Sequence, residues 1–128
     1  MVCGIGIDSV DIDRFSLWHT YSRKKLQRIF SLEEIEYCLS NQQKSAERFA
    51  ARFAAREALY KALSYAYPEK TVPFLTLCSA TTVTKQFGLA RLIVHNAFGI
   101  DMNALRIHFS LSHSRTIATA FVVIERHN

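Results

Sequence analysis

The spacing of apolar residues along the chain predicts helices in much of the first half and strands in the second. Between residues 11 and 66 the apolar side chains recur three and four positions apart, which is the period of an amphipathic helix. From Leu75 onward they alternate with polar residues, and threonine and valine are frequent, which is typical of strands. The pattern predicts an α+β fold, with helices packed on a small, mostly antiparallel sheet.

Local signals set the limits of these elements. Ser31 and Glu34 form a capping box, which predicts a helix start, and Pro68 and Pro73 bracket the loop after the longest helix. No repeat or linker interrupts the chain, so we expect one domain over residues 1–128. The predicted helices are Asp11–Phe30 in one or two pieces, Ser31 to about Ser40, and Ala46–Ala66. The predicted strands are Val2–Asp8, Leu75–Thr84, Ala90–His95, Leu105–Ser112 and Ile117–Glu125, with a turn at Gly88 and a short connection, Asn96–Asn103.

Charge and cysteine usage narrow the class of protein. The net charge of +5 favours acidic partners such as phosphates, an acidic protein, nucleic acid or an anionic membrane, without choosing among them. Cys3, Cys38 and Cys78 lack the CxxC spacing of a zinc site, and an odd number argues against a disulfide framework. The sequence shows no signal peptide and no apolar stretch that could span a membrane. These features predict a cytoplasmic protein with free thiols and no membrane partner.

The first segment with chemical potential is Gly4-Ile5-Gly6-Ile7-Asp8. Asp8 follows two glycines on one side of the predicted strand, at its end. Glycine allows a ligand or another backbone to approach closely, which makes Asp8 a candidate functional carboxylate. The alternative is that Asp8 only caps the turn that follows.

The second segment lies on the longest predicted helix. Residues four apart share a helix face, so Phe49, Phe53, Glu57 and Lys61 form one stripe, with the alanines on the opposite, packing face. Two further cations, Arg52 and Arg56, flank this stripe. A carboxylate beside aromatic rings needs a partner if the face is partly buried. The alternative is a solvated Glu57–Lys61 pair of little energetic weight.

The third segment is the predicted strand around His108. Strand alternation places His108, Ser110 and Ser112 on one side, and Phe109 and Leu111 on the other. Three polar side chains on one sheet face are suited to an anionic ligand. An ordinary exposed sheet face and a structural histidine are the alternatives.

Taken in order, these segments resemble the holo-acyl-carrier-protein synthases, the small trimeric group of phosphopantetheinyl transferases. The resemblance covers nearly the whole chain. Four segments carry it: Gly4-Ile5-Gly6-Ile7-Asp8, Arg52-Phe53-Ala54-Ala55-Arg56-Glu57-Ala58-Leu59-Tyr60-Lys61-Ala62, His108-Phe109-Ser110-Leu111-Ser112-His113-Ser114, and Ala118-Thr119-Ala120-Phe121-Val122-Val123-Ile124-Glu125.

The resemblance implies a magnesium-dependent transfer of phosphopantetheine from coenzyme A to a serine of acyl carrier protein, in fatty acid biosynthesis. Asp8 and Glu57 would bind Mg²⁺, and Lys61 would lie near the reacting phosphate. Either Glu57, directly or through water, or His108 would accept the serine proton. The family is trimeric, with coenzyme A between subunits. The residues that would contact coenzyme A are Arg52, Phe53, Arg56, Lys61, His108, Ser110 and His113.

The resemblance also supplies a partner for the basic residues of the first predicted helical segment. Carrier proteins are strongly acidic, so Arg14, Arg23, Lys24 and Arg28 would form the docking face. The alternative is a solvated basic surface without a partner.

Three departures from the family pattern are expected to affect coenzyme A binding more than metal binding. The chain has Leu63-Ser64-Tyr65 after the long helix, where the family has a glycine-rich loop. Gly88-Leu89-Ala90 replaces a Gly-Lys-Pro turn, and Arg56 replaces a lysine. An inactive, carrier-binding member and a member that serves another carrier, such as a polyketide one, stay open as alternatives. A small nucleic-acid-binding module is also possible, but it would not need Asp8 or Glu57 and no such motif occurs, so we expect no nucleic acid partner.

Overall fold

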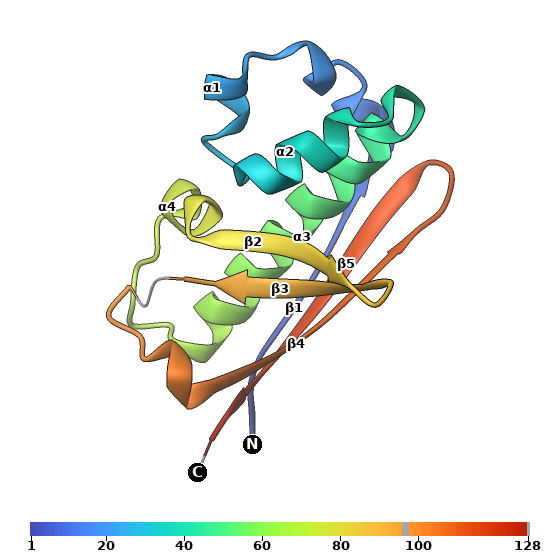
Figure 1. The fold of residues 1–128 in the computed structure, drawn as a ribbon. Coiled ribbons are helices and arrows are strands. Elements are labelled where there is room, and N and C mark those ends of the chain that lie inside the picture. The colour runs from blue at the N-terminus through green and yellow to red at the C-terminus, as the bar shows by residue number, and fades with distance from the viewer. Residues whose placement is uncertain (96–97, 128) are drawn as a thin grey trace.

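The chain folds around one long helix, α3, which lies between a three-stranded sheet and a two-stranded hairpin (Figure 1). The structure, a computed structural model, describes residues 1–95 and 98–127. The helices are α1 (Arg23–Leu26), α2 (Leu32–Leu39), α3 (Ser45–Ala66) and α4 (Phe74–Ser79), with short 3₁₀ turns at Ile12–Phe15, Trp18–Thr20, Gln42–Lys44 and Met102–Ala104. The strands are β1 (Val2–Asp11), β2 (Thr81–Gln86), β3 (Leu89–Val94), β4 (Leu105–His113) and β5 (Ile117–Arg126).

The larger sheet is antiparallel, with the strand order β1-β5-β4. Alternate residues of the central strand β5 are fully buried against α3, because successive side chains of a strand point to opposite faces. The other face of this sheet is open. It carries large apolar side chains that are about half exposed, namely Ile5, Ile7, Ile117 and Phe121.

Helix α3 packs so closely on β1 because the strand has glycines at the contact. A Cβ atom at Gly6 would lie 1.8 Å from the Ala58 carbonyl oxygen, and one at Gly4 would lie 2.3 Å from the Ala62 carbonyl oxygen. The alanine face of the helix therefore meets bare strand backbone. Of the two roles that the sequence left open for these glycines, the structure shows the approach of another backbone.

The opposite side of α3 is also buried, beneath an aromatic cluster. Phe53 belongs to this cluster, with ring centroids 5.5 Å from Phe15, 5.9 Å from Trp18 and 5.9 Å from Phe74. The sequence indicated a partly buried stripe on this side. Burial extends further than expected, because helix α3 has neighbours on both sides.

The predicted fold class is confirmed, and one predicted strand is wrong in part. Leu75–Thr84 divides into helix α4 and strand β2, because Phe74, Leu77 and Cys78 have helical spacing after Pro73. The first strand runs past Asp8 to Asp11, so Asp8 lies within it and does not cap a turn. The capping box is present, with Ser31 Oγ and the Glu34 side chain both bonded as predicted. Of the predicted connection Asn96–Asn103, residues 96 and 97 lie outside the described residues.

The three cysteines are free. Burial raises the pKa of the Cys38 and Cys78 thiols to about 12, so both thiols are protonated at neutral pH. Among the described residues, no helix is both long and apolar enough to cross a membrane.

Candidate active site

An acidic cluster forms where β1 crosses α3. Asp8 comes from the strand and Glu57 and Lys61 from the helix. The close strand–helix contact at the preceding glycines brings their side chains together. The Lys61 ammonium group donates to Asp8 Oδ1 at 3.0 Å and to the Ile7 carbonyl oxygen at 3.0 Å. The structure thus unites three residues that the sequence placed in two separate motifs.

The cluster holds more negative charge than one lysine balances. Burial and the neighbouring charge of Asp8 raise the pKa of the Glu57 carboxyl group, against the opposing effects of Lys61 and Arg14. The Arg14 guanidinium lies over the Phe53 ring at 4.9 Å, which places it at the edge of this cluster. A carboxylate whose pKa is raised by the charge of a second carboxylate beside it is part of a pair that suits a divalent cation.

The donor set fits Mg²⁺ with incomplete protein ligation. Magnesium is commonly held by one or two carboxylates, with water and substrate phosphates as the other ligands. Asp8 and Glu57 supply such a pair. Within residues 1–95 and 98–127 no group of three or more His, Cys, Asp or Glu side chains is placed to hold a metal ion. A metal at this cluster would thus leave positions for a phosphorylated ligand.

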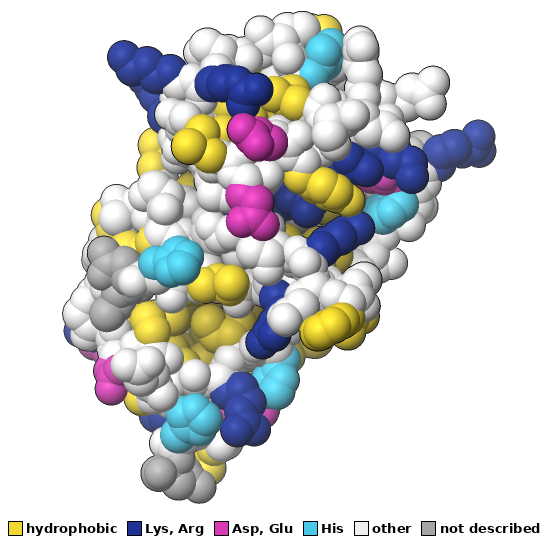
Figure 2. Space-filling model, in the orientation of Figure 1, with side chains coloured by type: hydrophobic (Ala, Val, Ile, Leu, Met, Phe, Trp, Pro, Cys, Tyr) yellow, Lys and Arg dark blue, Asp and Glu magenta, His cyan; other side chains and the backbone are white. Residues whose placement is uncertain are grey.

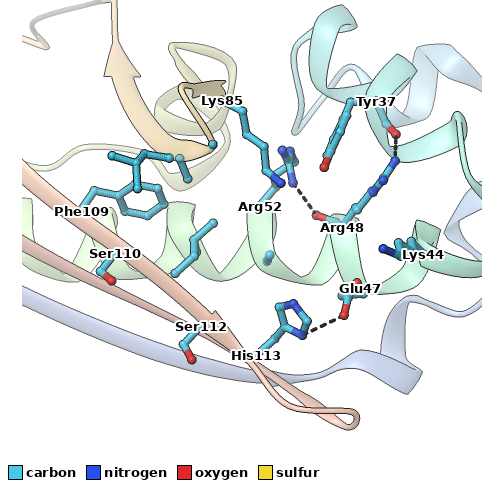
Figure 3. Close-up of a pocket in the computed structure, with 15 residues that line it drawn as sticks. Tyr37, Lys44, Glu47, Arg48, Arg52, Lys85, Phe109, Ser110, Ser112 and His113 are labelled. Carbon is cyan, nitrogen blue, oxygen red and sulfur yellow. Dashed lines mark hydrogen bonds and ion pairs between the residues drawn. The ribbon is translucent and has the colours of Figure 1, made fainter.

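A second, cationic site lies on the other side of α3. It is a pocket of about 480 Å³ between α2, α3, the β2–β3 hairpin and the edge strand β4 (Figure 3). Figure 2 shows lysine and arginine side chains gathered where the hairpin meets α2 and α3. The residues that line the pocket are Tyr37, Lys44, Glu47, Arg48, Ala51, Arg52, Lys85, Gly88, Leu89, Ala90, Phe109, Ser110, Leu111, Ser112 and His113.

Several predicted cofactor residues meet in this pocket. Arg52 comes from α3 and His113 from the end of β4. Ser110 of β4 also borders the pocket, although its register places its side chain on the sheet face that carries His108. His113 Nδ1 lies 2.8 Å from Glu47 Oε1, which fixes the imidazole at the end of β4 against α3. The substituted turn Gly88-Leu89-Ala90 also lines the pocket, so a changed loop still contributes to its wall.

Two residues that were predicted to contact the cofactor are buried in the core of this chain. Arg56 is fully buried and donates to Glu34 Oε2 at 2.9 Å and to the Thr81 and Cys78 carbonyl oxygens at 2.7 and 3.3 Å. A buried guanidinium with these partners is a structural group that joins α2, α3 and β2. Phe53 is 6% exposed within the aromatic cluster and carries Arg14 on its ring, so it belongs to the core.

The predicted catalytic residue His108 lies apart from the acidic cluster. Its side chain is on the open face of the sheet, where Nε2 forms an ion-pair contact with Glu125 of β5. That hydrogen bond lowers the pKa of the Glu125 carboxyl group. Asp8 of β1 points to the face of the sheet that packs on α3, whereas His108 points to the other face. The strands that carry them, β1 and β4, are the two edges of the sheet.

The predicted docking residues separate into two groups. Arg23, Lys24 and Arg28 are exposed on and just after α1, on the outer surface. Arg14 instead is stacked on Phe53 beside the acidic cluster.

Sequence reasoning missed three residues of the cationic pocket: Tyr37, Arg48 and Lys85. They come from α2, α3 and β2, and no motif or shared period connects them. The signal that was available was the position of Arg48 one helical turn before Arg52, on the same face of α3.

A nucleotide-sized pocket lined by cations and a separate pair of carboxylates together define a protein that handles a phosphorylated ligand. Comparison with known proteins is consistent with that class. A family model described as the 4'-phosphopantetheinyl transferase superfamily matches residues 4–121. The holo-[acyl-carrier-protein] synthase of Treponema denticola is 35% identical over 131 residues, covering 98% of this chain and 99% of the relative. That of Geobacter metallireducens is 36% identical over 130 residues, covering 98% and 99%.

Solved structures agree. The holo-(acyl-carrier-protein) synthase of Bacillus anthracis, in complex with CoA (3',5'-ADP), has a TM-score of 0.77 at 26% identity, covering 100% of this chain and 99% of that one. The Helicobacter pylori enzyme in complex with coenzyme A has a TM-score of 0.70 at 26% identity, covering 94% and 99%. The chain therefore belongs to the 4'-phosphopantetheinyl transferase superfamily, which confirms the family resemblance of the sequence motifs.

Proposed function

We propose that this protein transfers phosphopantetheine from coenzyme A to a serine of an apo acyl carrier protein, leaving adenosine 3',5'-bisphosphate. The observation that carries the proposal is the meeting of Asp8, Glu57 and Lys61 where β1 crosses α3. Such a cluster suits phosphoryl transfer, in which catalysis is mainly positioning and charge neutralisation. The relatives named holo-[acyl-carrier-protein] synthase indicate the substrates.

In this mechanism the serine Oγ forms a bond to the β-phosphorus of coenzyme A. The bond from that phosphorus to the oxygen that bridges to the adenosine bisphosphate breaks, and the bisphosphate departs with that oxygen. Asp8 and Glu57 would hold Mg²⁺, which when bound supplies charge neutralisation for the pyrophosphate. Lys61 contributes a further positive charge beside Asp8.

The serine proton passes to the Glu57 carboxylate, directly or through water. The raised pKa makes Glu57 a stronger base than an ordinary glutamate. His108, the other candidate, lies on the open face of the same chain's sheet, paired with Glu125. We therefore assign Glu57 as the base that accepts the serine proton within one chain. His108 could accept it only if it came from a neighbouring subunit.

We further propose a homotrimer with its active sites between subunits. Two features support this arrangement. Ile5, Ile7 and Phe121 form an apolar group on the open sheet face, a feature typical of interaction surfaces. The acidic cluster and the cationic pocket also lie at opposite edges of the sheet. One ligand could contact both sites more readily if the acidic cluster of one subunit faced the cationic pocket of the next. Light scattering should give the mass of three chains, and Phe121→Asp should lower both that mass and the transfer rate.

Carrier docking is assigned to the exposed cations of α1, Arg23 and Lys24, with Arg28 just beyond. An acidic carrier would be attracted and oriented by this surface. Arg14 lies closer to the cluster, where it would meet the carrier's serine region. We place the reaction in the cytoplasm, since three free cysteines are typical of a reducing compartment.

The deciding experiment follows the intact mass of an apo carrier incubated with the protein, coenzyme A and Mg²⁺. The expected result is a gain of one phosphopantetheine that is abolished by chelator, by Asp8→Ala and by Glu57→Ala. No gain with a folded protein and several carriers would overturn the proposed activity. A gain that survives chelation would overturn the metal assignment alone.

A further inference from the structure

The inner end of the cationic pocket is built around one tyrosine. Three cationic groups lie about the Tyr37 ring: the Arg48 guanidinium carbon at 4.0 Å from the ring centroid, that of Arg52 at 4.6 Å and the Lys85 ammonium nitrogen at 5.4 Å (Figure 3). They come from α3 and β2, whereas Tyr37 belongs to α2. The ring is therefore the one surface that all three cations share, and cation–π attraction holds each of them against it.

Tyr37 is itself held firmly enough to act as such a platform. A buried ion pair between Glu34 and Arg56 joins helix α2 to helix α3. Glu34 lies three residues before Tyr37 on α2. The Arg48 Nη1 group donates to the Tyr37 carbonyl oxygen at 2.8 Å and to Ser40 Oγ at 3.1 Å. Arg48 thus meets Tyr37 through both its backbone and its ring, and the guanidinium has little freedom to swing out of the pocket.

One buried cationic donor at this end of the pocket has no hydrogen-bond partner among the described residues. The acidic side chain in the described lining, Glu47, pairs with His113 at the other end of the pocket. Glu34 is paired with Arg56, and its Oε2 lies 4.0 Å from Arg52 Nε, beyond hydrogen-bonding distance. Arg52 Nε is buried and has no hydrogen-bond partner among the described residues. A buried donor without a partner is costly, and an anion in the pocket would supply one.

The positive charges around Tyr37 change the pKa of its phenol group. A hydrogen bond with Lys85, together with the charges of Arg48, Lys85 and Arg52, lowers the pKa of Tyr37 in spite of its partial burial. Cations that lower the pKa of a phenol also attract an anionic ligand, and a dianion more strongly than a monoanion, because each negative charge meets the same three cations.

We propose that Tyr37 is a positioning residue that fixes Arg48, Arg52 and Lys85 as a preformed cradle for the ribose phosphate of coenzyme A. Tyr37 thereby sets the preference for coenzyme A over 3'-dephospho-coenzyme A. The inference rests on the proposed function, because it takes coenzyme A as the ligand. The pyrophosphate is assigned to the acidic cluster, so the terminal phosphate monoester is the dianion that remains for these cations. The cradle is preorganised, which reduces the entropy lost on binding.

Steady-state kinetics with the two forms of the cofactor test this role. Tyr37→Leu removes the ring, and we expect the KM for coenzyme A to rise about tenfold, with kcat within about threefold of the wild-type value. The KM for 3'-dephospho-coenzyme A should hardly change. Tyr37→Phe keeps the ring and should keep most of the preference. Tyr21→Leu, at a tyrosine outside the pocket that carries the Lys25 ammonium nitrogen 3.9 Å from its ring centroid, is the matched control and should keep the wild-type KM for both cofactors. Equal losses with both cofactors, or no loss with either, would overturn the proposal.

A binding experiment separates this proposal from the proposed function. Calorimetry with adenosine 3',5'-bisphosphate and with adenosine 5'-monophosphate requires no turnover. A wild-type preference for the bisphosphate that is lost in Tyr37→Leu supports the cradle even if no carrier is modified. Equal binding of both nucleotides to the wild type refutes the cradle even if transfer occurs. If Tyr37→Leu does not fold, Lys85→Met alters the exposed rim of the same cradle and should reduce the same preference severalfold.

Discussion

The two sides of helix α3 carry opposite chemistry on different kinds of support. On the side of β1, Asp8, Glu57 and Lys61 form a compact cluster that depends on two glycines and a close strand–helix contact. On the side of β4, the cations depend on α2, α3 and the hairpin, which are tied together by the buried Arg56. In the acidic cluster, the charged side chains differ from the glycines that hold the backbone in place. In the cationic pocket, the charged residues that would bind a ligand belong to the same network as the buried Arg56 that holds the elements together.

This difference predicts which substitutions should reduce activity and which should reduce stability. The Lys61–Asp8 pair is partly exposed, so solvent screens it and its loss should affect chemistry more than folding. The Glu34–Arg56 pair is fully buried, so its loss should affect folding first. The following predictions test this contrast, beginning with the largest expected effect.

Breaking the buried pair should be the most damaging change. Glu34→Ala leaves the Arg56 guanidinium buried without its carboxylate and should lower the free energy of unfolding by about 3–5 kcal/mol. Urea unfolding measures this loss. Glu33→Ala, at the exposed neighbouring position, and Lys61→Met should each cost less than about 1 kcal/mol. A Glu34→Met/Arg56→Met double variant should recover part of the stability; a double variant less stable than Glu34→Ala would argue against an uncompensated charge as the cause.

The two sides should divide catalysis from cofactor binding. Glu57→Gln keeps the shape of the side chain but removes its charge, and kcat should fall by about a hundredfold or more with little change in the KM for coenzyme A. Arg52→Met should raise that KM about tenfold and leave kcat within a few fold. Steady-state rates with saturating carrier measure both. The reverse assignment, with Arg52→Met acting on kcat alone, would show that the cationic pocket takes part in the chemical step.

Charge reversal on α1 should have a smaller effect that depends on salt. Replacing Arg23, Lys24 and Arg28 by glutamate should raise the KM for the carrier about tenfold at low salt, since the attraction of an acidic partner is lost. The effect should shrink as ionic strength rises. Lys70→Glu, at an exposed lysine beyond α3, is the matched control for the single reversal Lys24→Glu. An equal effect in the control would indicate that only the overall charge matters.

The smallest predicted change is in a titration. Because Lys85 is the main cause of the lowered Tyr37 pKa, Lys85→Met should raise that pKa back toward the ordinary tyrosine value. At a pH between the Tyr37 pKa of the wild type and that of the variant, a larger fraction of Tyr37 is protonated in the variant than in the wild type. NMR of tyrosine labelled at the ring Cζ carbon can follow this shift, with Tyr65 as an internal reference. An unchanged Tyr37 titration would mean that Lys85 does not reach the phenol.

Much of the fold was predictable because it follows from local rules. The bounds of α3, the capping box of α2 and the alternation of β4 and β5 depend on neighbours a few residues apart. The region of α4 was predicted wrongly because Leu75 and Leu77 alternate like a strand, although Leu77 and Cys78 are buried on one side of a helix. Short apolar segments fit both periods, and packing decides between them.

By itself, the sequence determined the family and the residues of the acidic cluster, because these lie in continuous motifs on one strand and one helix. The sequence also named Arg52 and His113 of the cationic pocket, and the tertiary structure decided the other members of the site. Arg56 looked like a ligand contact because its charge suggests exposure, yet Glu34 and two carbonyl oxygens hold it in the core. Tyr37, Arg48 and Lys85 form one cradle only after three segments pack together. Local periodicity reports which face a side chain takes, whereas a charge network depends on distances between elements that no local pattern encodes.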